Sequence, residues 1–89
     1  MSNENDSLED LKYLLGNMGV EILYAIDKGA KDIETIKIFS GLPISCIKGR
    51  IPVLIDLKLI DKDKGEFHLA KKGANFKQYL KESSDKGQI

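Results

Sequence analysis

The spacing of the apolar residues changes along the chain, and this change restricts the folds that are open to it. Up to Leu57 the apolar residues recur every three or four positions, the period of an α-helix. From Leu59 to Leu69 the pattern is strand-like, and helical spacing returns between Ala74 and Leu80. We therefore expect a mainly α fold with a small β-hairpin, in which helices precede the hairpin and one helix follows it.

Four helical segments are expected before the hairpin. A glycine and an asparagine interrupt the first run, so we expect a break at Gly16-Asn17. Asp32 has the short acceptor side chain of a helix N-cap, and Ser40-Gly41 predicts the turn after the helix that it caps. Pro52 lies inside the last segment and is expected to kink or shorten it. The segments cover residues 8–15, 18–28, 33–39 and 43–57.

The hairpin and the two polar ends define the predicted domain. Leu59-Ile60 is expected to be a short strand, Lys62-Asp63-Lys64-Gly65 the turn, and Glu66-Phe67-His68-Leu69 the returning strand. The polar ends of the chain continue none of these patterns. We therefore expect a disordered N-terminus over residues 1–7, one domain over residues 8–82, and a flexible C-terminal tail over residues 83–89.

The sequence contains few residues of the types that bind metals, form disulfides or act in catalysis. Cys46 is the only cysteine and His68 the only histidine, so we expect neither an internal disulfide nor a metal site. Carboxylate pairs, nucleophile–base pairs and glycine-rich phosphate loops do not occur at credible spacing, which excludes an enzyme. We expect no cofactor. A leader-like start and a membrane-length apolar run are also missing from the sequence, so we expect a soluble, cytoplasmic protein that does not bind membranes.

The formal net charge of zero hides an uneven distribution of charge. Residues 1–40 contain four lysines and eight acidic residues, whereas residues 41–81 contain nine basic and four acidic residues. Such segregation favours a polyanionic partner for the basic part of the chain. The alternative interpretation is that these lysines only keep the surface solvated.

Three stretches resemble the winged helix-turn-helix regulators. The stretch VEILYAI, from Val20 to Ile26, is similar to their first-helix signature. Residues 33–60 resemble their second helix, glycine-containing turn, recognition helix and entry to the hairpin, or wing. The stretch FHLAKKG, which ends at Gly73, resembles the return strand and the start of the last helix, with Ala70 where threonine is usual. The resemblance covers about residues 18–82 and does not separate the MarR-like, ArsR-like and PadR-like small regulators of archaeal type.

The resemblance implies sequence-specific binding of double-stranded DNA by a transcriptional regulator. A recognition helix at about residues 43–57 would enter the major groove, and the hairpin 61–67 would lie on the phosphate backbone or in the minor groove. Arg50, the only arginine, can bond guanine through two hydrogen bonds, and the alternative is a phosphate contact. Lysines at the hairpin would contact phosphate, unless they only solvate the turn. The candidate DNA-binding residues are Ser45, Lys48, Gly49, Arg50, Lys62 and Lys64.

Two kinds of protein partner are also expected. Short winged-helix proteins commonly pair through terminal helices, so the resemblance implies a homodimer formed by the helices Leu8–Leu15 and Phe76–Leu80. The alternative function is a protein–protein interaction module in a replication, transcription or RNA-processing assembly. The zero net charge and the apolar residues Ile38, Val53 and Ile55 favour that alternative.

Overall fold

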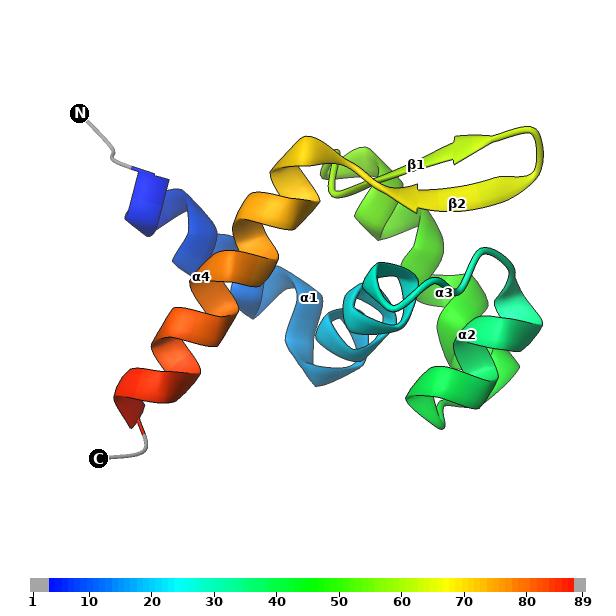
Figure 1. Ribbon diagram of the computed structural model, residues 1–89, viewed down its shortest axis with the longest axis horizontal. Helices are drawn as coiled ribbons and strands as arrows, with labels where there is room; N and C mark the ends of the chain where they lie inside the picture. The colour runs from blue at the N-terminus through cyan, green and yellow to red at the C-terminus, as the bar shows by residue number, and fades with distance from the viewer. Residues whose placement is uncertain (1–3, 88–89) are drawn as a thin grey trace.

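The computed structural model describes residues 4–87, and it describes side chains for residues 9–82. Within these limits there are four helices and one antiparallel two-stranded sheet, so the expected mainly helical fold with a small hairpin is confirmed. Figure 1 shows α4 and the first half of α1 at one end of the molecule, and α2, α3 and the hairpin toward the other. The elements are α1 (Glu4–Asp27), α2 (Ile33–Ser40), α3 (Ile44–Asp56), β1 (Ile60–Asp63), β2 (Glu66–Leu69) and α4 (Lys71–Gly87).

Helix α1 is divided by Gly16, as the Gly16-Asn17 pair predicted. The φ and ψ angles of Gly16 are 67° and −178°, which lie outside the helical region and are accessible because glycine has no Cβ. The chain therefore changes direction in the middle of α1, and its two halves pack as separate helices.

Helical backbone extends beyond the predicted domain at both ends. Helix α1 begins at Glu4 rather than near Leu8, and α4 continues to Gly87. Residues 1–3 and 88–89 lie outside the described residues. The disorder of residues 1–7 and the flexibility of residues 83–89 therefore stay predictions. Between residues 4 and 87, no single helix is long and apolar enough to cross a membrane, and only the bent pair of α2 and α3 reaches that length and composition together.

Helix α2 is bounded by the two signals that the sequence predicted for it. The Asp32 carboxylate accepts a hydrogen bond of 2.8 Å from the backbone N–H of Thr35, which confirms Asp32 as the N-cap. Gly41 adopts the left-handed conformation, with φ of 76°, and its N–H donates to the carbonyl oxygen of Lys37. These two residues fix the length of α2 at eight residues.

We expect Asp32→Ala to lower the Tm by a few degrees, because an N–H group in the first turn of α2 loses its acceptor. The hydrogen bond from the Thr35 backbone N–H also holds the pKa of Asp32 below its ordinary value of 3.8. The contribution of this cap is therefore complete above the unfolded-state pKa and is lost as the pH falls through the folded-state pKa. Thermal unfolding from neutral to strongly acidic pH measures both effects. Asp32→Asn keeps the acceptor but not the titration, and an Asp32→Ala protein as stable as wild type would contradict the capping role.

Helix α3 runs from Ile44 to Asp56 and continues past Pro52, so the expectation that this proline shortens the helix is wrong. Pro52 is exposed, and so is Lys48, whose carbonyl oxygen is the one that a residue 52 N–H would contact in a helix. Water can therefore replace the missing donor. The proline is tolerated because it lies on the solvent side of the helix.

The first strand of the hairpin begins at Ile60, one residue later than the sequence predicted, and it is longer than predicted. Lys62 and Asp63 belong to β1 rather than to the turn, and Asp63 pairs with Glu66 of β2. Only Lys64 and Gly65 form the turn, with φ angles of 53° and 81°. A two-residue turn with both φ values positive has the twist that an antiparallel pair requires. Lys64 therefore lies at the tip, as predicted, whereas Lys62 lies on the strand.

The core lies where the four helices and the hairpin meet, and α2 contributes Ile36 to it. An apolar stripe on α3 contributes to it, because Ile47, Ile51 and Leu54 are buried and Ile44 is half-buried. Phe76 of α4 is fully buried in the same cluster. Burial of these side chains fixes the orientation of α3, and hence which of its residues reach solvent.

Candidate nucleic-acid interface

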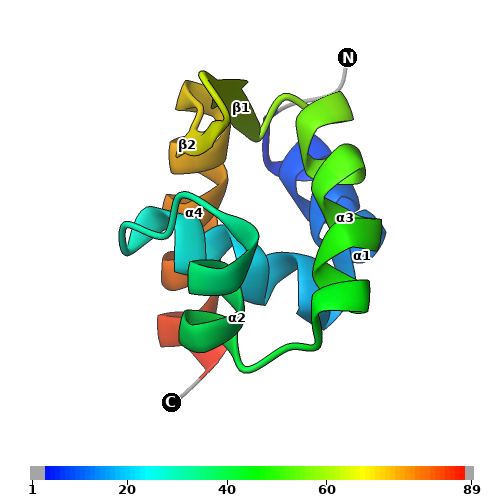
Figure 2. The ribbon, with the colours of Figure 1, turned by 90° about the vertical axis from the view of Figure 1, so that its right-hand side faces the viewer.

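Helices α2 and α3 form a bent pair at one end of the molecule. The three residues Gly41-Leu42-Pro43 join them, and the two helices are bent by 109°. The N–H of Leu42 donates to the hydroxyl of Ser40 at 3.2 Å, and Pro43 begins α3 in an extended conformation. Figure 2 shows α3 along the outside of the molecule, with α1 behind it. The turn therefore presents one long face of α3 to solvent.

The exposed face of α3 is narrow and carries little charge. Its centre is formed by Ser45, Gly49 and Pro52, opposite the buried stripe of the helix. No atom lies within 4 Å of the position that a Cβ of Gly49 would occupy. Asp56 adds one exposed carboxylate at the C-terminal end of this face. The small side chains allow the α3 backbone to approach another surface closely.

The structure brings Lys48 and Lys62 to opposite sides of one groove between α3 and the hairpin. The groove has a volume of about 370 Å³. The Lys62 ammonium lies 5.8 Å from the centroid of the Phe67 ring, a cation–π distance. A chain of phosphates lying across this groove would therefore meet a cation from each side. The other residues that line it are Ile33, Ile51, Pro52, Ile55, Asp56 and Phe67.

Arg50 lies apart from these two lysines. It follows Lys48 by two positions, which places the two side chains about 200° apart around the helix axis. Because Lys48 lines the groove beside the hairpin, Arg50 lies on the flank of α3 that is turned away from the hairpin. The sequence placed Arg50 on the outward face with the other candidates, but the side chain is half-buried at the edge of that face. Among residues 9–82, its guanidinium forms no hydrogen bond or ion pair.

Carboxylates alternate with lysines on the hairpin. The exposed carboxylates of Asp61, Asp63 and Glu66 lie close in the sequence to Lys62 and Lys64. Much of the basic surplus of residues 41–81 lies elsewhere, on exposed lysines of α4. These are Lys71, Lys72 and Lys81. The charges on the hairpin therefore alternate in sign, and its surface is not uniformly basic.

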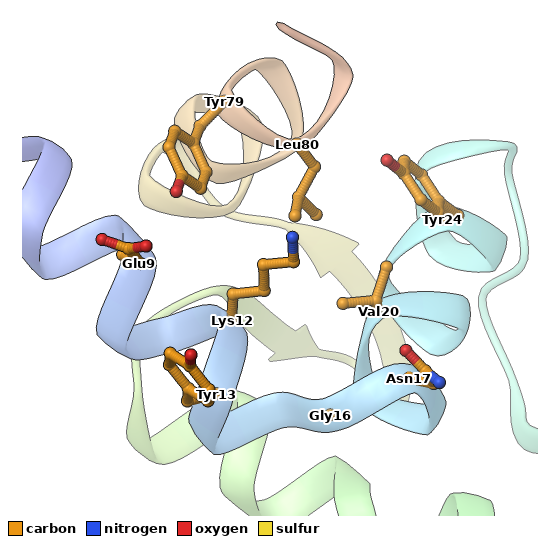
Figure 3. Close-up of a pocket in the computed structure, with 9 residues that line it drawn as sticks. All are labelled: Glu9, Lys12, Tyr13, Gly16, Asn17, Val20, Tyr24, Tyr79 and Leu80. Carbon is orange, nitrogen blue, oxygen red and sulfur yellow. The ribbon is translucent and has the colours of Figure 1, made fainter. Parts of the chain in front are cut away.

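A second hollow, which the sequence did not predict, lies between the bend of α1 and α4 (Figure 3). Its volume is about 680 Å³. Three tyrosines from distant positions in the sequence line it. The residues that line it are Glu9, Lys12, Tyr13, Gly16, Asn17, Val20, Tyr24, Tyr79 and Leu80.

The fold defines a small, mainly helical protein with one two-stranded hairpin. In comparisons with known proteins, no family model, curated protein or solved structure matches the chain. Functional inference therefore depends on the geometry of the two ends of the molecule. Within the described residues, no group of three or more His, Cys, Asp or Glu side chains is placed to hold a metal ion.

Proposed function

We propose that the protein is a winged helix-turn-helix transcriptional regulator that binds double-stranded DNA. One observation carries this proposal: α2 and α3 are joined by a three-residue turn that contains Gly41, and they are bent by 109°. Helix-turn-helix motifs join two helices at about 90–120° through a short turn that often contains glycine. The hairpin and α4 follow in the order that a winged version of this motif requires.

In this proposal, α3 enters the major groove and the hairpin is the wing. Ser45 and Gly49 lie at the centre of the exposed face, where the helix can come close to the base edges. Lys48 and Lys62 flank the groove that would receive the phosphate backbone, and Lys64 at the hairpin tip would reach a further phosphate. Arg50, at the edge of the face, contacts either a guanine or a phosphate.

The experiment is selection from random duplex DNA, followed by fluorescence anisotropy at two salt concentrations. We expect the affinity of the wild-type protein to fall steeply with added salt. Lys48→Ala combined with Lys62→Ala should weaken binding to every sequence about tenfold or more, and should reduce the slope of log K against log salt by about 2. Arg50→Ala should relax sequence preference if Arg50 reads a base, and should weaken all sequences equally if it contacts phosphate.

The matched control is Lys81→Ala, which removes an exposed lysine from α4 and should leave DNA affinity unchanged. The proposal is overturned if the selected duplexes bind no better than random ones. It is also overturned if the double variant at Lys48 and Lys62 binds as tightly as the control.

We further propose that two copies of the chain pair, which would present two α3 helices to half-sites about one helical turn apart. Part of each helix expected to pair is used by the core of one copy. Leu11, Leu15, Phe76 and Leu80 are buried within one copy, and the side chain of Leu8 lies outside the described residues. The terminal helices can therefore pair only through side chains that the core of one copy does not use.

A protein-interaction module is the second candidate function, and the surface of α2 favours it. The side chain of Ile38 is 75% exposed and that of Phe39 is 46% exposed, whereas Val53 and Ile55 are half-buried. Exposed neighbouring apolar residues commonly mark a protein contact. If this is the function, affinity for DNA stays at the non-specific level and Ile38→Ser disrupts a protein complex instead.

A further inference from the structure

The hollow between α1 and α4 exists because α1 bends. The non-helical backbone of Gly16 turns the two halves of α1 apart, and Asn17 and Val20 of the second half form one wall. Tyr79 and Leu80 of α4 form another. Figure 3 shows the side chain of Lys12 extending from α1 into the space toward Leu80. The hollow is therefore mixed in character, with apolar and polar side chains in its walls and an ammonium within it.

The rim of this hollow carries a projecting aromatic side chain. Tyr13 is 84% exposed, which makes it the most exposed large apolar side chain among those described. Figure 3 shows it on the same side of the hollow as Glu9, with Tyr24 and Asn17 on the opposite side. A tyrosine so exposed loses the contacts that its ring makes when enclosed, where it buries about 150–250 Å². The face thus holds both a projection and a space beside it.

The same rim carries both signs of charge. Glu9 and Lys12 both line the hollow, and within residues 9–82 Lys12 forms no ion pair. In a two-fold symmetric contact, a residue i of one copy meets residue j of the other, and j meets i. A face that contains a projection, a space, a carboxylate and an ammonium has the elements that a self-complementary contact requires.

We propose that this face binds a second copy of the chain, with Tyr13 of each copy inserted into the hollow of the other. There the ring lies against Tyr24 and Tyr79, and Lys12 of each copy pairs with Glu9 of the other. The inference rests on the proposed pairing of two copies and is independent of DNA binding. It also leaves the end of the molecule with α2, α3 and the hairpin free, because the two ends are distinct (Figure 1).

The first test is sedimentation equilibrium of the full chain without DNA. A central aromatic anchor typically contributes 2 kcal/mol or more to an interface, so Tyr13→Ala should raise the dimer dissociation constant about thirtyfold or more. Lys37→Ala removes an exposed side chain from α2, away from the hollow, and should leave the constant unchanged. Circular dichroism confirms that both variants are folded.

The second test reverses single charges. Two copies of Lys12→Glu bring carboxylates against carboxylates, and two copies of Glu9→Lys bring ammoniums against ammoniums, so each variant alone should be monomeric. Mixed in equal amounts, the two variants should form a heterodimer, because every contact then joins opposite charges. A merely structural role of these exposed residues would not restore association on mixing.

The outcomes separate this inference from the proposed function. If all variants stay dimeric, the pairing uses another face and the inference is overturned while the pairing stands. If the wild-type protein is monomeric at every concentration, both the pairing and this face are overturned. Anisotropy on the same proteins tests DNA binding separately, since a monomer can still bind a half-site with steep salt dependence.

Discussion

Replacing Phe76 with alanine should lower the free energy of unfolding by about 3–5 kcal/mol, the usual effect of removing an enclosed aromatic ring. Phe76 is the largest of the fully buried side chains. Its ring stacks on that of Tyr79, with 6.3 Å between centroids, and it holds α4 against the rest of the core. A small domain has a total stability of about 5–15 kcal/mol, so the variant should lose a large part of it.

Urea unfolding followed by circular dichroism measures this change. The matched control is Leu14→Ala, since Leu14 lies on α1 with 59% of its surface exposed and should contribute less than about 0.5 kcal/mol. A Phe76→Ala protein with the urea midpoint of the wild type would mean that α4 is not docked in solution as the structure has it. Such a result would also remove the hollow that α4 forms with α1.

The break in α1 and the two ends of α2 were predictable from the sequence because each depends on one or two residues. The Gly16-Asn17 pair marks the break in α1, and Asp32 caps α2 through the N–H group three residues away. Gly41 ends α2 through its own left-handed conformation. Local signals of this kind can be read from the chain without knowledge of its tertiary contacts.

The hairpin and Arg50 were less predictable because their positions depend on distant contacts. The turn consists of Lys64-Gly65 alone, which is shorter than predicted, because the pairing of β1 with β2 extends to Asp63. The register of this pairing is a property of both strands together. The flank of α3 on which Arg50 lies depends on where the hairpin packs, which the helical period alone does not give. The groove that joins Lys48 and Lys62 was missed for the same reason.

The pairing residues show a different limit of sequence patterns. The pairing was assigned to the helices Leu8–Leu15 and Phe76–Leu80, in which Leu11, Leu15, Phe76 and Leu80 are buried in a single copy, whereas Leu14 is exposed and Tyr79 is half-buried. Apolar periodicity shows that a face is covered but not by which chain. Only the structure distinguishes these residues from Tyr13, which has no covering partner among the described residues.

The two candidate faces lie in different parts of the molecule but are structurally connected. The groove flanked by Lys48 and Lys62 lies beside the hairpin, whereas the hollow beside Tyr13 lies between α1 and α4. The start of α4 connects them, because its backbone packs against the beginning of β1. The backbone N–H of Ala70 donates to the carbonyl oxygen of Leu59 at 3.0 Å. The position of the hairpin relative to α3 therefore depends on how closely α4 can approach Leu59.

Gly73→Ala should destabilise the fold by about 1–3 kcal/mol, the usual effect of adding a methyl group to a filled core. A Cβ at Gly73 would overlap the backbone carbonyl oxygen of Leu59 and would come within 2.9 Å of the Leu69 side chain. Leu59 cannot move away without weakening its hydrogen bond from Ala70. The glycine of the FHLAKKG stretch is thus explained by the close approach of α4 to the hairpin.

The sign of the change in unfolding free energy distinguishes a close contact at Gly73 from an open helical position. Alanine is the better helix former by about 1 kcal/mol, so at an open helical position the same substitution stabilises. Gly49→Ala in α3 is the matched control, because no atom lies within 4 Å of the added Cβ. Urea unfolding should therefore give opposite signs for the two variants. If Gly73→Ala also stabilises the protein, α4 does not pack closely on Leu59, and the hairpin is not held beside α3 in the way that the proposed DNA binding requires.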